Sequence, residues 1–241
     1  MTKTPLLLLI WLLGSVSTEA QDLRPVFDAR LAPAPAKVGA ADTALLERLV
    51  RPAARQAWKG SEGCKDEFEI LDAGAGSFTR RGVQQRVFLY RFCTTGHGFG
   101  ASGIAIIGES GHVAAHLVYE GATDYALGTL PDLDGDGLSE ILLVGGSTNQ
   151  GITATSVALI GITPDGAKKL GLFPVYEDNC GTGAAPIATA WRLLAHPGPK
   201  PTFSRERFVR KSCEEASWQK AGEAERVSPE ADATDFRRLA S

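Results

Sequence analysis

The 241-residue chain lacks a strong excess of charge of either sign. Its formal net charge of −3 argues against nucleic acid and against an electrostatically bound membrane surface as partners. The four cysteines include no CxxC pair, so a zinc or redox site of that kind is not expected. The hydrolase motifs GxSxG and HExxH are also missing, so the sequence carries neither of these catalytic signatures.

Only one long apolar run is present, Pro5–Leu13 near the N-terminus. Lys3 precedes this run, and Thr18-Glu19-Ala20 after it resembles a small-residue cleavage site, so we expect residues 1–20 to be a signal peptide. A retained N-terminal anchor is the alternative. No cysteine precedes Cys64, which excludes a lipid-modified N-terminal cysteine. The mature protein is therefore predicted to be secreted or periplasmic, with no membrane span after signal cleavage.

Four cysteines in an exported chain predict two disulfide bonds. They are Cys64, Cys93, Cys180 and Cys213, and they allow three pairings. Proximity in the sequence favours Cys64 with Cys93 and Cys180 with Cys213.

Composition divides the mature chain into three parts. Residues 21–41 are rich in Ala and Pro and indicate an extended linker. Residues 42–221 are predicted to form a single β-rich domain. From residue 222 to 241, Glu, Ala, Ser and Arg dominate, which predicts a disordered tail.

The domain is expected to begin with an amphipathic helix. Asp42 is a candidate N-cap, apolar residues recur at helical spacing from Leu45 to Ala53, and Gly60 ends the segment. Pro52 removes a backbone donor and must kink or split the helix. We expect this helix to pack against the sheet.

Nine short β-like runs follow, separated by turns that contain glycine. They cover residues 68–71, 87–93, 104–107, 113–119, 141–144, 155–163, 170–176, 187–195 and 203–211. Such close spacing favours antiparallel hairpins over parallel βαβ units. The segment 204–218 is also compatible with a helix, and residues 145–153 form a polar loop that could serve as a recognition surface.

The most informative stretch is the acidic segment between the fourth and fifth runs. Its sequence D-x-D-x-D-G-x-x-E places oxygen ligands at loop positions one, three, five, seven and nine, and Gly137 allows the chain to turn around an ion. Many oxygens in a loose arrangement suit Ca²⁺ better than Mg²⁺. The predicted calcium ligands are Asp132, Asp134, Asp136, the main-chain oxygen of Leu138, and Glu140.

Three other kinds of site or turn have a similar sequence pattern. An EF-hand requires Glu at position twelve, where this chain has Leu143 in an apparent strand. The run from Asp132 to Gly135 also resembles the D-x-D-G motif of haloacid-dehalogenase-like phosphatases, but Pro131 interrupts the strand that this motif needs. A metal-free turn is the third alternative, because Asp and Gly are common in turns.

The segment Leu130–Gly146 resembles the calcium loop of FG-GAP repeats, the blade units of integrin α-subunit propellers and of secreted bacterial proteins. Phe99–Ala105 resembles a second, degenerate copy that lacks the carboxylates of an acidic loop. The resemblance implies a loop that joins two blade strands around a mostly structural ion. Because nine strands cannot close a four-bladed ring, we expect mainly antiparallel β structure in an incomplete, propeller-like sheet with the N-terminal helix packed on it.

Together these features predict an exported, non-catalytic calcium-binding module whose partner is an unknown protein or glycan, or an envelope protein with no ligand beyond the ion. The alternative is a small secreted hydrolase with a metal-assisted site and a base such as His97. His112 and His116 alternate with Val113, Ala115 and Leu117 and are therefore expected to face solvent.

Overall fold

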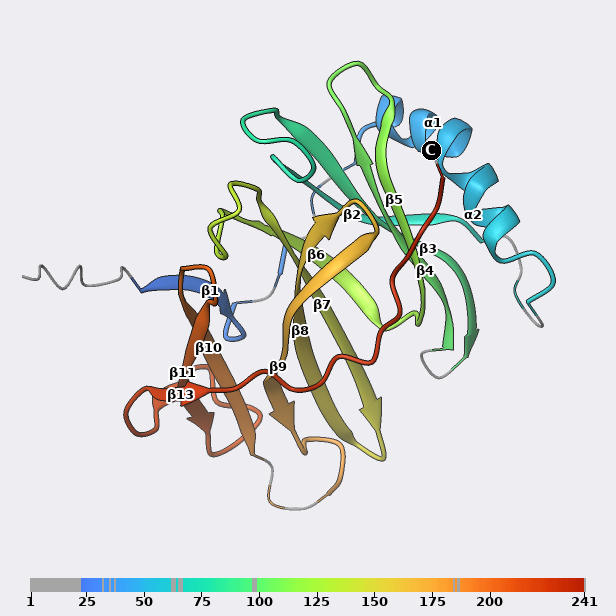
Figure 1. Cartoon of the computed structure of the whole chain (residues 1–241). Coiled ribbons are helices and arrows are strands. Elements are labelled where there is room, and N and C mark those ends of the chain that lie inside the picture. Colours follow the sequence, from blue (N-terminus) through green and yellow to red (C-terminus); the bar gives the residue numbers. More distant parts are fainter. Residues whose placement is uncertain are drawn as a thin grey trace, which may run out of the picture.

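The computed structural model describes residues 23–240, except 32, 35, 37, 62, 63, 65, 66, 97, 98, 184 and 186. The predicted signal peptide lies outside these residues. The described chain is mainly antiparallel β structure in two open sheets, with two short helices (Figure 1), which confirms the predicted fold class.

The described residues form two helices and fourteen strands. In chain order they are β1 (Arg24–Asp28), α1 (Ala40–Leu49), α2 (Arg51–Ala57), β2 (Glu69–Gly76), β3 (Gln85–Gly96), β4 (Phe99–Ile107), β5 (Val113–Glu120), β6 (Asp124–Leu130), β7 (Glu140–Asn149), β8 (Ile152–Thr163), β9 (Gly166–Asp178), β10 (Ala188–His196), β11 (Thr202–Arg210), β12 (Gln219–Lys220), β13 (Glu225–Val227) and β14 (Arg237–Arg238).

The larger sheet has nine strands in the order β12-β11-β10-β9-β8-β7-β6, with β1 paired to β10 and β13 paired to β11. Its central strands are apolar on both faces. On β7, Ile141 and Leu143 belong to one buried cluster, whereas Leu142 and Val144 belong to another. Because successive side chains of a strand point to opposite faces, this sheet has a core on each side.

The smaller sheet has five strands in the order β14-β5-β4-β3-β2 and faces the larger one. Leu89, Ile104 and Leu117 stand opposite one another on three neighbouring strands. These three side chains join Ile141 and Leu143 of the larger sheet in one buried cluster, the inter-sheet core. Burial of this apolar area is the main force that holds the two sheets together.

The helices cover the outer face of the smaller sheet, as predicted (Figure 1). Leu46, Val50 and Ala54 are fully buried in a cluster that includes Phe88 and Tyr90 of β3. Pro52 lies at the start of α2 and separates it from α1, which confirms the predicted split. The N-cap of α1 is Gly39 rather than Asp42, because the helix begins at Ala40 and Asp42 lies in its first turn.

On its other face the larger sheet has a second core, formed by buried residues of β6 to β11 together with β1 and the loop after β6. Val26 of β1 and Leu133 of that loop are both buried there. The predicted linker over 21–41 thus contains a paired strand. Composition does not reveal it, because the strand depends on pairing with β10, far along the chain.

The C-terminal segment also differs from the prediction of a disordered tail. It runs from β13 on the larger sheet to β14 on the smaller one (Figure 1). Phe236 is 9% exposed and belongs to the inter-sheet core. This polar segment is ordered because one aromatic side chain is buried and its backbone pairs with strands of both sheets.

Two further predictions differ from the structure. The polar loop expected at 145–153 is a hairpin in which β7 and β8 pair as far as Asn149 and Ile152. Gln150 and Gly151 form its turn, both with positive φ. The helical alternative for 204–218 is wrong where β11 runs, because this strand pairs with β10 along its whole length.

The two disulfides follow the pairing that proximity favoured. Cys64 bonds Cys93, which ties the segment after α2 to β3, and Cys180 bonds Cys213, with Cα–Cα distances of 5.4 and 6.0 Å. Among the described residues, no helix has both the length and the apolar character needed to span a membrane.

Candidate metal site

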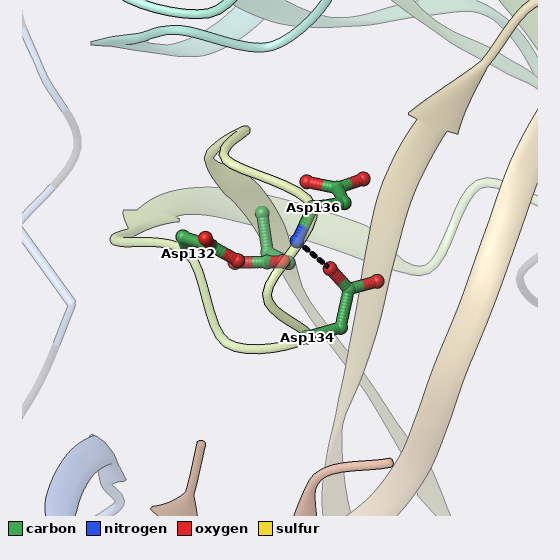
Figure 2. A group of neighbouring side chains, drawn as sticks. Asp132, Asp134 and Asp136 are labelled. Carbon is green, nitrogen blue, oxygen red and sulfur yellow. Dashed lines mark hydrogen bonds between the residues drawn. The ribbon is translucent and has the colours of Figure 1, made fainter. Parts of the chain in front are cut away.

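The structure gathers the four predicted carboxylates at the loop between β6 and β7. Asp132, Asp134, Asp136 and Glu140 can each offer one oxygen such that all four oxygens lie within 4.8 Å of one another. Figure 2 shows the three aspartates on the loop that carries them. The acidic cluster, as we call these four residues, is thus a group that could hold a metal ion.

Local hydrogen bonds and two glycines explain why the loop closes on itself. The Asp132 carboxylate accepts a hydrogen bond from the Gly135 amide at 2.7 Å and one from the Gly137 amide at 2.9 Å. Gly135 and Gly137 have φ of 81° and 80°. Only glycine adopts this conformation without strain, so the chain can wrap around Asp132.

The other two aspartates each accept one hydrogen bond from a backbone amide two residues further along the loop. Asp134 Oδ1 accepts from the Asp136 amide at 3.1 Å, the dashed line in Figure 2, and Asp136 Oδ1 accepts from the Leu138 amide at 2.8 Å. These bonds are Asx turns, which organise the loop from within. The fifth predicted ligand, the main-chain oxygen of Leu138, stays a prediction.

Glu140 and Asp134 are the two buried carboxylates of the acidic cluster. Glu140 is 2% exposed, and its Oε2 accepts a hydrogen bond from the Leu133 amide at 2.9 Å. Burial raises the pKa of Glu140 to about 8, a rise that the hydrogen bond opposes and the negative charges of the three aspartates increase. Without a cation, the ionised form of this side chain is therefore unfavourable.

The protein supplies part of the missing positive charge. Lys168 of β9 places Nζ 2.5 Å from Asp134 Oδ2, and the Asp134 side chain is 1% exposed. This hydrogen bond raises the pKa of Lys168. Among the described residues it is the one ion pair that the acidic cluster makes, so four carboxylates face a single ammonium. An all-oxygen donor set with this excess of negative charge fits a hard divalent cation.

The loop is fixed to several distant parts of the fold. The Leu133 carbonyl accepts a hydrogen bond from the Gly198 amide of the β10–β11 turn at 2.8 Å. The Ser139 amide donates to the Ser77 carbonyl at 2.8 Å, just after β2. A metal ion in this loop would therefore act where three separate segments meet.

None of the described histidines belongs to the acidic cluster. His97 lies outside the described residues, and His112 contacts Ser110 Oγ through Nδ1 at 2.6 Å. His116 is 2% exposed, and its Nε2 lies 2.6 Å from the Tyr90 hydroxyl. The prediction that His116 faces solvent is wrong, because the helices cover the face of β5 that the strand pattern assigned to water.

Sequence reasoning missed Lys168, which belongs to a strand far along the chain from the acidic loop. Only the pairing of β8 with β9, and of β8 with β7, brings it there. No short-range signal distinguishes Lys168 from its neighbour Lys169, whose Nζ donates instead to the Asp232 carbonyl.

Comparisons with known proteins give no relative: no family model, no curated protein and no solved structure matches this chain. The resemblance of residues 130–146 to FG-GAP repeats therefore stays a prediction. The two open sheets do not form a closed propeller.

Proposed function

We propose that this protein is an exported, non-catalytic calcium-binding β module of FG-GAP-like type, acting as a binding or envelope structural protein. One observation carries the proposal: four carboxylates of one loop converge within 4.8 Å, and one lysine pairs with them. Two disulfides support an oxidising compartment outside the cytosol.

Calcium is favoured over other divalent ions by the nature of the donors. Ca²⁺ accepts six to eight oxygens in flexible geometry, whereas Mg²⁺ demands a near-ideal octahedron. The acidic cluster supplies four carboxylates, and the Leu138 carbonyl and water complete the proposed shell. With few protein ligands, we expect weak affinity, with a dissociation constant of roughly 10⁻⁴ to 10⁻³ M, as in extracellular modules.

The proposed role of the ion is structural. Asp132 and Glu140 delimit a loop whose Leu133 side chain is buried in the second core and whose Leu133 carbonyl binds the β10–β11 turn. An ion that neutralises the cluster would hold these contacts together. Because it would bind only the folded chain, it would raise the free energy of unfolding, by about 2.7 kcal/mol at a hundred times the dissociation constant.

The test is a calcium titration followed by melting temperature on the wild type and Asp136→Asn. Asn keeps an oxygen that can accept from the Leu138 amide, so this variant removes charge and leaves the turn intact. Asp165→Asn, in the exposed turn before β9, is the matched control. Calcium is expected to raise the melting temperatures of the wild type and the control. It should raise the melting temperature of Asp136→Asn much less.

Two results would count against the proposal. The first is a wild type whose melting temperature does not respond to calcium, and the second is an equal response in Asp136→Asn. A screen of ester, phosphate and glycoside substrates distinguishes the non-catalytic module from the alternative, a secreted hydrolase. Turnover that depends on the metal would favour the hydrolase.

A further inference from the structure

A second group of acidic side chains surrounds a cavity that is separate from the acidic loop. The cavity has a volume of about 300 Å³ and is lined by residues of β5, β6, β7, β8 and β9, with the C-terminal segment contributing Asp232, Thr234 and Phe236. This segment is the red chain that crosses from the larger to the smaller sheet in Figure 1. The last part of the sequence thus completes the wall of the cavity.

Asp124 is the first acidic group of this cavity. Its Oδ2 accepts a hydrogen bond from the Tyr119 hydroxyl at 2.6 Å, and burial raises the pKa of its carboxyl. The absence of a side chain at Gly145 makes room for it, because a Cβ there would lie 2.5 Å from Asp124 Oδ1. The backbone of β7 is therefore shaped around this carboxylate.

Asp232 is the second acidic group, and it has an unmade hydrogen bond. Its Oδ1 accepts from the Thr234 amide at 2.8 Å, while its Oδ2 is buried and has no hydrogen-bond partner. The negative charge of Asp232 also contributes to the raised pKa of Asp124, so the two carboxylates interact. A buried carboxylate oxygen without a donor is costly, and a ligand with N–H groups would satisfy it.

Among the residues that the structure describes, no lysine or arginine lines the cavity. Two cations of the described residues come near. Arg91 donates to the Asp124 carbonyl at 3.4 Å, and its charge opposes part of the rise in the pKa of Asp124, whereas Lys169 donates to the Asp232 carbonyl at 2.8 Å. Glu120 adds a third carboxylate at the exposed rim. The cavity therefore carries three carboxylates in its lining.

The rest of the lining has an apolar part, formed by Leu143, Ala158, Leu172 and Phe236, and a part with hydroxyl groups, formed by Thr123, Ser147, Ser156 and Thr234. A bare metal ion would leave these surfaces and most of the volume unused. A ligand with a positive end and an aliphatic body matches both parts of the lining, as in most small-molecule sites, where an apolar wall is combined with a few polar groups.

We propose that this cavity binds a small aliphatic amine in its ammonium form, held by charge-assisted hydrogen bonds to Asp232 and Asp124. The aromatic rings of Tyr119 and Phe236, whose centroids lie 4.9 Å apart, stand beside the same carboxylates and offer further contact to a cation. This inference does not depend on calcium binding, because the acidic loop contributes no residue to the cavity.

The test is isothermal titration calorimetry with 1,5-diaminopentane, and with 1,5-pentanediol as a neutral probe of the same length. Asp232→Asn removes the charge and keeps an oxygen for the Thr234 amide, while Asp235→Asn is the control on the same segment, exposed and outside the cavity. Circular dichroism and melting temperature establish that both variants fold.

We expect saturable binding of the diamine and none of the diol. Asp232→Asn should weaken diamine binding at least about tenfold, as expected when a charged partner is lost, and Asp235→Asn should bind like the wild type. Asp136→Asn, in the acidic loop, should also bind the diamine normally, which separates this result from the outcome for calcium. No saturable binding by the wild type, equal binding of diol and diamine, or an undiminished Asp232→Asn would each overturn the proposal.

Discussion

Asp72 and the acidic loop show two ways of burying carboxylates in one molecule. Asp72 of β2 is 3% exposed, and three backbone amides donate to it: Ala36 at 2.6 Å, Ala73 at 2.8 Å and Leu127 at 2.8 Å. Because Leu127 lies on β6, this carboxylate joins the smaller sheet to the larger one. The protein itself supplies every donor that the site uses.

The acidic loop is different, because its four carboxylates have backbone donors within the loop but only one ammonium, that of Lys168. Hydrogen bonds satisfy individual oxygens, yet they leave most of the mutual repulsion in place. The comparison teaches that burial of an acid does not by itself indicate a ligand. What distinguishes the loop is charge that the protein does not neutralise.

The largest expected effect is at Asp72. Asp72→Ala should lower the free energy of unfolding by about 3 kcal/mol, because three amides lose their acceptor, among them the buried Leu127 amide, and an unsatisfied buried donor costs about 1–3 kcal/mol. The loss should be the same with and without calcium. Urea denaturation measures it, with Asp165→Asn as the control, and a loss below about 1 kcal/mol would contradict the role given to Asp72.

His116 is a second buried titratable side chain, and it tests whether one hydrogen bond can offset the cost of burying a charged group. Burial lowers the pKa of His116 from 6.5 to about 4, with only the Tyr90 hydroxyl as partner. The unfolded chain therefore binds a proton at higher pH than the folded chain does. Stability should fall as the pH drops from 6.5 towards 4, by about 2 kcal/mol at pH 5.

The difference between the wild type and His116→Gln isolates this contribution, because the variant cannot titrate in that range. The free energies of unfolding of the two proteins, measured by denaturation between pH 7 and pH 5, should converge as the pH falls. Parallel curves would mean that His116 is not buried in its neutral form.

The smallest expected effect concerns the ammonium that partly neutralises the loop. Lys168→Gln should raise calcium affinity about twofold to fivefold, because the ion no longer competes with Nζ for Asp134 Oδ2, and a pair whose lysine is half exposed is worth up to about 1 kcal/mol. Lys169→Gln is the matched control, since that neighbour binds the Asp232 carbonyl. Weaker calcium binding in Lys168→Gln would contradict the account.

The features that the sequence predicted are those that a few neighbouring residues determine. Short β-like runs indicated β7 and β8, and the spacing of Asp132, Asp134 and Asp136 predicted their convergence. Pro52 predicted the split helix, because the loss of one backbone donor acts locally.

The missed features depend on residues far apart in the chain. Pairing between distant segments places all three of them: strand β1 in the predicted linker, Phe236 in the predicted disordered tail, and Lys168 beside Asp134. His116 was misassigned for a related reason: a strand pattern shows two faces but does not show that helices cover the second one. The cavity beside Asp124 and Asp232 also exists only in the folded chain.

The most direct test of the central claim is equilibrium dialysis of radioactive calcium against the metal-free wild type and Asp134→Ala. The Asp134 side chain is 1% exposed, and its carboxylate accepts from the Asp136 amide and pairs with Lys168. The account predicts one calcium bound per wild-type chain and none per variant chain in the same concentration range. A wild type that binds no calcium, or a variant that binds it equally well, would contradict the account.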